Sequence, residues 1–186
     1  MKALVLVALL ALGACASPEP AYFTLAPVPG PAIASGPRLV EMRRPGLAGY
    51  LDRPEIVRAS SAYQLRLLGG ERWAEPFGDM VSRVLIEDLN QRLPGTSVFS
   101  ATGAISADAS ANLEVDVQRF DSDASGLVRL VAQVAIARGR NRPPVSTRAI
   151  QLTQMPTGRS TGELAAAMSA LLGQMSDQIA TMLRSF

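Results

Sequence analysis

Three successive stretches of alternating residues, followed by one long amphipathic stretch, place the strongest limit on the fold of this chain. Residues 113–118, 127–138 and 145–153 alternate between apolar and polar side chains, which is typical of strands with one buried face. The short polar segments between them predict tight turns, so the three strands should pair antiparallel as a meander. The apolar face of such a sheet must be buried under a second layer.

Two helices are expected to supply that layer. Ser160 and Glu163 have the spacing of a capping box, in which each side chain binds the backbone N–H of the other residue. An apolar stripe at helical spacing follows: Leu164, Ala167, Met168, Leu171, Leu172, Met175, Ile179, Met182 and Leu183. The earlier helix begins at Pro76 and ends before Pro94, with Asp88 away from its apolar stripe. The pattern predicts an α+β fold, a two-layer sandwich in which two helices pack on one face of a mostly antiparallel sheet.

Shorter extended segments are also expected outside the meander. Tyr63, Leu65 and Leu67 alternate with polar residues, so residues 62–68 are predicted to form a half-buried strand, with Gly69-Gly70 as the turn that follows it. Other short strands are expected at 22–25, 38–42, 55–59 and 96–100.

The start of the sequence resembles a bacterial lipoprotein signal. Lys2 precedes an apolar run over residues 3–12, which is shorter than the roughly 20 residues needed to cross a bilayer but has the length of a signal sequence. Leu12-Gly13-Ala14-Cys15 resembles the lipobox, so we expect residues 1–14 to be removed and Cys15 to carry diacylglycerol and an N-acyl chain. An ordinary secretory signal with an incidental cysteine is the alternative, although no second cysteine offers a disulfide partner.

The segment after the cysteine is rich in proline. Residues 15–37 are expected to form a lipidated N-terminus and an extended tether, with the short strand 22–25 docked on the domain. Residues 38–186 have the length of one domain. Ala16 follows the cysteine, where an aspartate would favour the inner membrane of enterobacteria. Since two or more acyl chains anchor a protein stably, we expect a periplasmic protein held in the lipid of the outer membrane.

Composition excludes several kinds of chemistry. The chain has no histidine and Lys2 is its only lysine, which excludes Ser-His-Asp catalysis, Ser-Lys catalysis and histidine-based metal sites from the mature sequence. The 16 acidic residues nearly balance the 18 basic ones, and no basic run predicts binding to nucleic acid. We therefore expect no enzyme, no metal and no cofactor beyond the lipid on Cys15.

Three local patterns have a structural interpretation beside a functional one. Residues 121–126 resemble the start of a calcium loop but lack the glutamate at its twelfth position, so a hairpin turn is expected. Residues 138–142 are either a solvated loop or a basic tip that touches lipid headgroups or an acidic partner. Met168, Met175 and Met182 belong either to the core or to a lipid groove.

Three segments, in this order, resemble those of a known family. Tyr22-Phe23-Thr24-Leu25 is similar to the opening YYTL of that family, Leu51-Asp52-Arg53-Pro54 to its YLDRPxIV segment, and Arg72-Trp73-Ala74-Glu75-Pro76 to its RWAEPL segment, with Phe77 in place of the leucine. The family is that of the ABC-type transport auxiliary lipoproteins, the PqiC-like accessory proteins of MCE-type lipid transporters. The resemblance spans most of the mature chain.

The resemblance implies a role in lipid transport that is not catalytic. Proteins of this family are periplasmic, are anchored to the outer membrane, and work with an ATPase, a permease and an MCE-domain protein that forms a hydrophobic conduit. The lipoprotein would dock the conduit to the outer membrane as a homo-oligomer. A lipid shuttle with a pocket between the sheet and the C-terminal helix is one alternative, and an assembly factor or activator of another envelope machine is the other.

Five residues of these segments are the candidates for partner binding: Leu51, Asp52, Arg53, Trp73 and Glu75. Asp52 and Arg53 are either contacts to a partner or a structural ion pair, and surface ion pairs contribute little to stability. Trp73 is either an interface residue or a core residue at the junction of helix and sheet.

Overall fold

The computed structural model describes residues 19–33, 36–105, 107–139 and 143–186. The expected lipobox with Cys15, and residues 140–142 of the expected basic tip, lie outside the described residues. Within the described residues nine strands form one sheet: β1 (Ala21–Phe23), β2 (Leu39–Met42), β3 (Gly46–Leu47), β4 (Glu55–Ser61), β5 (Gln64–Trp73), β6 (Ser97–Ser100), β7 (Ala111–Ser122), β8 (Val128–Ala137) and β9 (Pro144–Gln154). The helices of this part of the chain are α2 (Phe77–Arg92) and α3 (Thr161–Arg184).

The sheet is mixed. β7, β8 and β9 pair antiparallel along their length, as their alternation predicted, and β4 and β5 form a second antiparallel hairpin. β2 lies parallel between β6 and β7, and β1 runs parallel to the end of β5. Parallel neighbours need long connections, and the β4–β5 hairpin and α2 separate β2 from β6 in the sequence. Local alternation carries no information about pairing between such distant segments.

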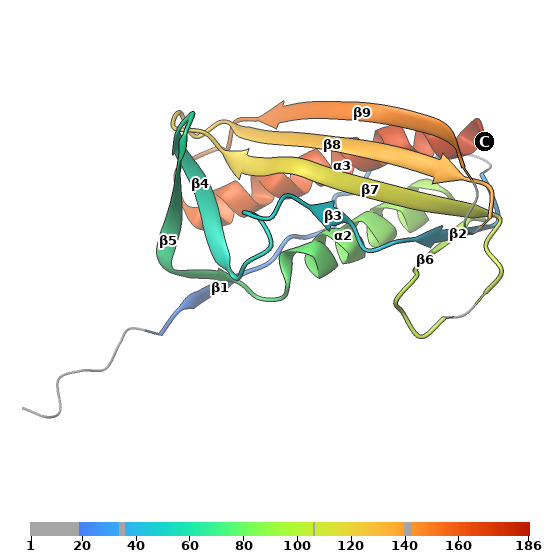
Figure 1. The fold of residues 1–186 in the computed structure, drawn as a ribbon, viewed down its shortest axis with the longest axis horizontal. Coiled ribbons are helices and arrows are strands. Elements are labelled where there is room, and N and C mark those ends of the chain that lie inside the picture. Colours follow the sequence, from blue (N-terminus) through green and yellow to red (C-terminus); the bar gives the residue numbers. More distant parts are fainter. Residues whose placement is uncertain (1–18, 34–35, 106, 140–142) are drawn as a thin grey trace, which may run out of the picture.

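Figure 1 shows both helices on one face of the sheet, which confirms the predicted two-layer α+β fold. Leu113 on β7 and Leu130 on β8 are fully buried, as is Met175 on α3. Met168 and Met182 are also buried and belong to the same apolar cluster. The methionine stripe is therefore part of the core between α3 and the sheet.

The predicted capping box starts α3. The Ser160 N–H donates to Glu163 Oε2 at 3.0 Å, and the Glu163 N–H donates to Ser160 Oγ at 3.3 Å. The hydrogen bond from the Ser160 hydroxyl, followed by that from its backbone N–H, lowers the pKa of Glu163. The carboxylate consequently stays charged at the positive end of the helix dipole.

Two expectations for β5 are wrong. The strand continues through Gly69-Gly70, where a turn was expected, to Trp73, and Gly70 accommodates a φ of +80° within it. Ala62 and Tyr63, expected to begin the strand, form the turn of the β4–β5 hairpin. Leu65 and Leu67 lie on the side of the strand that was expected to be buried, but they are 47% and 44% exposed. The reason is that none of the described elements packs on that side of the hairpin.

The segment after β1 packs on α2. The Val28 N–H donates to Asp88 Oδ1 at 2.9 Å, and the Ile33 N–H donates to the Arg92 carbonyl at 2.6 Å. This segment covers a side of α2 that was expected to be polar, so Asp88 is only 1% exposed. Beyond the docked strand, the segment expected to be a tether thus contacts the domain as far as residue 33.

Candidate functional site

The three segments singled out in the sequence meet beside the start of α2. The Trp73 N–H donates a 2.8 Å hydrogen bond to the carbonyl of Pro54, and the Ala74 N–H donates a 2.8 Å hydrogen bond to the carbonyl of Phe23. Phe23 and Trp73 are also neighbours in the parallel pairing of β1 with β5. Segments far apart in the sequence therefore form one cluster. We call it the segment junction, and it comprises residues 22–25, 51–54 and 72–76.

The apolar candidates lie inside the segment junction. Leu51 is 4% exposed and Trp73 is 6% exposed. The Trp73 ring stacks on Phe77 of α2, with 5.1 Å between the ring centroids and 27° between the ring planes. Phe77 in turn contacts Phe120 of β7 at a centroid distance of 5.8 Å. Trp73 thus joins β5 to α2 at the junction of helix and sheet, and its ring adds apolar area and aromatic contacts to the core.

The charged candidates Asp52 and Arg53 do not pair with each other. Asp52 is exposed and lies 3.7 Å from the guanidinium of Arg44, which also binds Asp79 at 2.6 Å. The hydrogen bond with Asp79 raises the pKa of Arg44 above its ordinary value. Arg53 contributes a buried Nε that has no hydrogen-bond partner within the described residues. Asp52 of the segment junction therefore belongs to a group of exposed charges with Arg44 and Asp79, which lie beside the junction.

Glu75 connects the segment junction to α2. The Arg83 guanidinium donates to Glu75 Oε1 at 2.7 Å through Nη2 and at 3.1 Å through Nε, and Nη2 also donates to Thr24 Oγ1 at 3.1 Å. The hydrogen bond with Glu75 raises the pKa of Arg83. Glu75 thereby holds the N-terminal segment against the helix. Sequence reasoning named Glu75 but missed its contact with Arg83, eight residues away, and the contact of Arg44 with Asp79, 35 residues away, because neither spacing predicts an ion pair.

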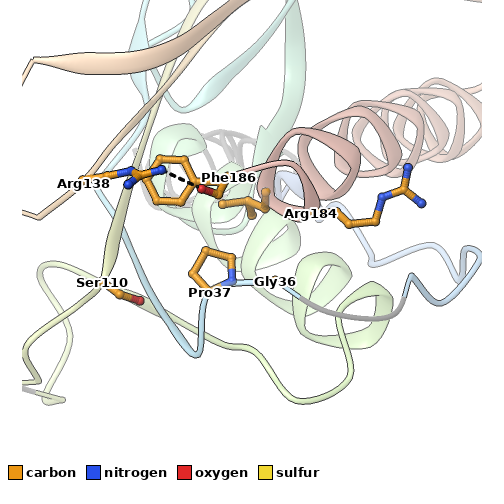
Figure 2. A pocket seen from close by; sticks show the side chains of 7 residues that line it. Gly36, Pro37, Ser110, Arg138, Arg184 and Phe186 are labelled. Atoms are coloured by element: carbon orange, nitrogen blue, oxygen red, sulfur yellow. Dashed lines mark hydrogen bonds between the residues drawn. The ribbon is translucent and has the colours of Figure 1, made fainter.

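A shallow pocket of about 460 Å³ lies at the C-terminal end of α3. Figure 2 shows Arg138 against Phe186 in this pocket. The Arg138 guanidinium donates to the Phe186 carbonyl at 3.0 Å and lies 5.2 Å from the ring centroid. This is the geometry of a cation–π contact. Of the expected basic tip, the described part of the chain thus places Arg138 against the end of α3.

The segment junction presents the exposed Asp52 above the buried Leu51 and Trp73. An exposed charge of this kind suits electrostatic recognition of a partner. In residues 19–33, 36–105, 107–139 and 143–186, no three potential metal ligands lie together. Neither helix of the described chain is both long enough and apolar enough to cross a membrane.

Comparison with known proteins places the chain among others of related sequence and fold. Residues 23–180 match the sequence profile of a family described as "ABC-type transport auxiliary lipoprotein component". The fold resembles a crystal structure of an uncharacterized protein, with a TM-score of 0.74 and 19% identity over 89% of this chain and 99% of that one. It also resembles a DUF330 protein from Xanthomonas campestris, with a TM-score of 0.70 and 20% identity over 89% of this chain and 95% of that one. No curated protein matches the sequence. The region that matches the family includes all of the segment junction except Tyr22.

Proposed function

Because the chain belongs to the family of ABC-type transport auxiliary lipoprotein components, we propose that it is the non-enzymatic accessory protein of an MCE-type ABC lipid transporter. In this role, acyl chains on Cys15 hold it in the periplasm at the outer membrane, and its domain links the MCE-domain conduit to that membrane. The observation that carries the proposal is the family match over residues 23–180, which contains the segment junction almost entirely.

The position of β1 supports an anchor close to the domain. β1 begins at Ala21, six residues after Cys15, and an extended chain of that length reaches about 20 Å. β1 is paired with β5, and Leu25 just after it is buried in the core. In this proposal the end of the molecule that carries β1 and β5 faces the membrane (Figure 1).

The exposed side of the segment junction is the proposed contact with the MCE-domain protein. Asp52 and Arg44 lie at the surface there, and charge complementarity across an interface favours fast and specific association. Leu51 and Trp73 are buried beneath this surface. Their part in binding is to position the loop that carries Asp52 and Arg53.

We further propose that copies of the chain associate by pairing along the free edge of β5. Leu65 and Leu67 are exposed on this strand. β1 pairs only with residues 71–73 of β5, so the preceding edge has no partner strand among the described elements. An unpaired edge with apolar side chains favours strand pairing with a second chain. Sedimentation equilibrium of the chain carrying Cys15→Ser should show an oligomer, and Leu65→Lys should weaken it.

Co-purification from membranes tests the proposed partner. The tagged, lipidated protein should recover an MCE-domain protein from detergent-solubilised membranes, and Asp52→Arg should reduce that recovery several-fold, because like charge at an interface is unfavourable. Asp108→Arg is the matched control, since Asp108 is an exposed acid outside the segment junction. If the wild-type protein recovers no MCE-domain protein, the proposed function is wrong.

Membrane fractionation tests the proposed anchor. Cys15→Ser should leave the circular dichroism spectrum and melting temperature of the domain unchanged, because residue 15 precedes its first described strand. The same variant should be absent from the outer-membrane fraction and should no longer support lipid transport. Retention in that fraction, or full function without the cysteine, would contradict the anchor.

A further inference from the structure

Three arginines line a cavity of about 650 Å³ between the β4–β5 hairpin, the end of β7 and the start of α3. Arg58 lies on β4, Arg66 on β5, and Arg159 in the loop before α3. Arg58 is paired across the sheet with Arg66 on one side and with Ser122 on the other. Residues paired in this way project from the same face of a sheet, so one row of side chains points towards the cavity.

The arrangement of these side chains is unfavourable without a ligand. Like charges directly opposite each other on neighbouring strands repel, and no ion pair joins the three arginines to an acid in the part of the chain that the structure describes. Arg58 Nη2 donates to Thr161 Oγ1 at 3.3 Å, but Arg58 Nε is buried without a partner. Ser122 is 2% exposed and its hydroxyl also has no partner. Because buried polar atoms nearly always have partners, these two donors favour an acceptor supplied by a ligand.

The acids around the cavity are engaged elsewhere. Asp123 lines the cavity, but its carboxylate accepts hydrogen bonds from the Ser125 hydroxyl at 2.5 Å and from Arg129 at 3.3 Å. Glu163 is held in the capping box, and Glu71 accepts a 2.7 Å hydrogen bond from Thr161. Because Glu163 already occupies the positive end of α3, that helix end is not the group that would hold an anion. The arginines define the site instead.

We propose that this cavity binds a phosphate group, held by Arg58 and Arg66, with Arg159 as a third positive charge. A guanidinium presents parallel N–H donors that match two phosphate oxygens, and the Ser122 hydroxyl can donate to another. Two sources carry this chemistry, the headgroup of an anionic phospholipid and free inorganic phosphate. The inference does not depend on a transporter partner and goes beyond the proposed function.

Binding is measured with the chain from residue 15 onward carrying Cys15→Ser, so that neither an acyl anchor nor the apolar run 3–12 contributes. One arm titrates inorganic phosphate by isothermal calorimetry. The other sediments the protein with phosphatidylglycerol vesicles, with phosphatidylcholine vesicles as the reference. Binding in the first arm alone identifies free phosphate as the ligand, and binding in the second alone identifies the lipid headgroup. Either result supports the site, and binding in neither arm overturns it.

Arg66→Gln is the principal variant, because Arg66 is exposed and its loss should leave the fold intact. We expect Arg66→Gln and Arg58→Gln each to weaken binding about tenfold, as for the loss of one charged hydrogen-bonding group. The matched control is Arg72→Gln, an exposed arginine of the same strand that does not line the cavity. Unchanged binding in Arg66→Gln, or an equal loss in Arg72→Gln, would overturn the proposal.

Discussion

At the end of α2, Arg92 is surrounded by acceptors, whereas Arg58 and Arg66 on the β4–β5 hairpin face each other. Arg92 is 1% exposed, and its guanidinium donates to Asp177 at 2.6 Å and to the carbonyl of Val28 at 3.0 Å. The two hairpin arginines have no acid as a partner within the described residues. The difference teaches that one arginine completes the fold, while the other two present charge that a ligand would neutralise.

The Arg92 site joins three parts of the chain. Arg92 contacts the N-terminal segment through Val28, and it contacts α3 through Asp177 and the Gly173 carbonyl. On α2 it lies 3.4 Å from Asp88. Burial raises the pKa of Asp88, while the hydrogen bond from the Val28 N–H and the charge of Arg92 oppose that rise. The buried charges are thus compensated by one another and by backbone groups.

Replacing Arg92 should have the largest effect on stability. Arg92→Met removes the positive charge beside the buried Asp88 and the donor to the carbonyls of Val28 and Gly173. The expected loss is about 3–5 kcal/mol in the free energy of unfolding. Urea unfolding monitored by circular dichroism measures it. Arg72→Met, at an exposed arginine, should change stability by less than about 0.5 kcal/mol. An equal effect of the two substitutions would remove the contrast between the sites.

The loss in Arg92→Met should depend on pH. In the wild type, burial raises the pKa of Asp88 in the folded state above its pKa in the unfolded state. The stability that this group contributes is therefore fully present below the unfolded-state pKa, and it is lost as the pH rises through the folded-state pKa. Removing Arg92 takes away an effect that lowers this pKa, so the pKa rises further. Urea unfolding should therefore show a smaller destabilisation at about pH 4 than at about pH 7. Equal losses at both pH values would show that the buried charge of Asp88 does not account for the loss.

A smaller loss is expected when Arg92 is displaced rather than removed. A Cβ at Gly30 would collide with the Arg92 guanidinium, whose atoms are its three nearest neighbours. Because that guanidinium is held by its acceptors, Gly30→Ala should cost about 1–3 kcal/mol of stability, measured by thermal or urea unfolding. At Gly49 a Cβ would meet no atom within 4 Å. Gly49→Ala is therefore the control, and a similar loss there would argue against a fixed Arg92.

The smallest effect is expected at the cavity. In buffer free of phosphate, Arg66→Gln should leave the free energy of unfolding unchanged or raise it by up to about 1 kcal/mol, because it removes repulsion between paired like charges. Added phosphate should then raise the melting temperature of the wild type more than that of the variant. A clear destabilisation by Arg66→Gln in phosphate-free buffer would place this arginine with Arg92 among the structural ones.

Local patterns in the sequence predicted the parts of the fold that depend on neighbouring residues. The alternation of β7 to β9 and the capping box of α3 are examples, because hairpins and helix starts are determined within a few residues. The burial of Asp88 was not predicted. Its position on α2 is away from the apolar stripe, and only the distant segment around Val28 covers it.

The candidate site was predictable to a similar extent. The three segments of the junction were visible in the sequence, but their contacts with Arg44 and Arg83 depend on how the chain turns. The pairing of Arg58 with Arg66 depends on the register of the β4–β5 hairpin. Because Ala62 and Tyr63, which form the turn, were expected to begin the strand, that register could not be derived.

The parallel pairing of β1 with β5 has a mechanical consequence. Ala21, Tyr22 and Phe23 run beside Glu71, Arg72 and Trp73, so a pull on the N-terminal end of β1 loads the bonds between the strands in shear rather than one after another. The buried Leu25 and the contacts of Val28 with α2 spread the same load into the helices. Tension applied at the N-terminal end of β1 is therefore shared by β5, the core and α2 instead of falling on a single strand end.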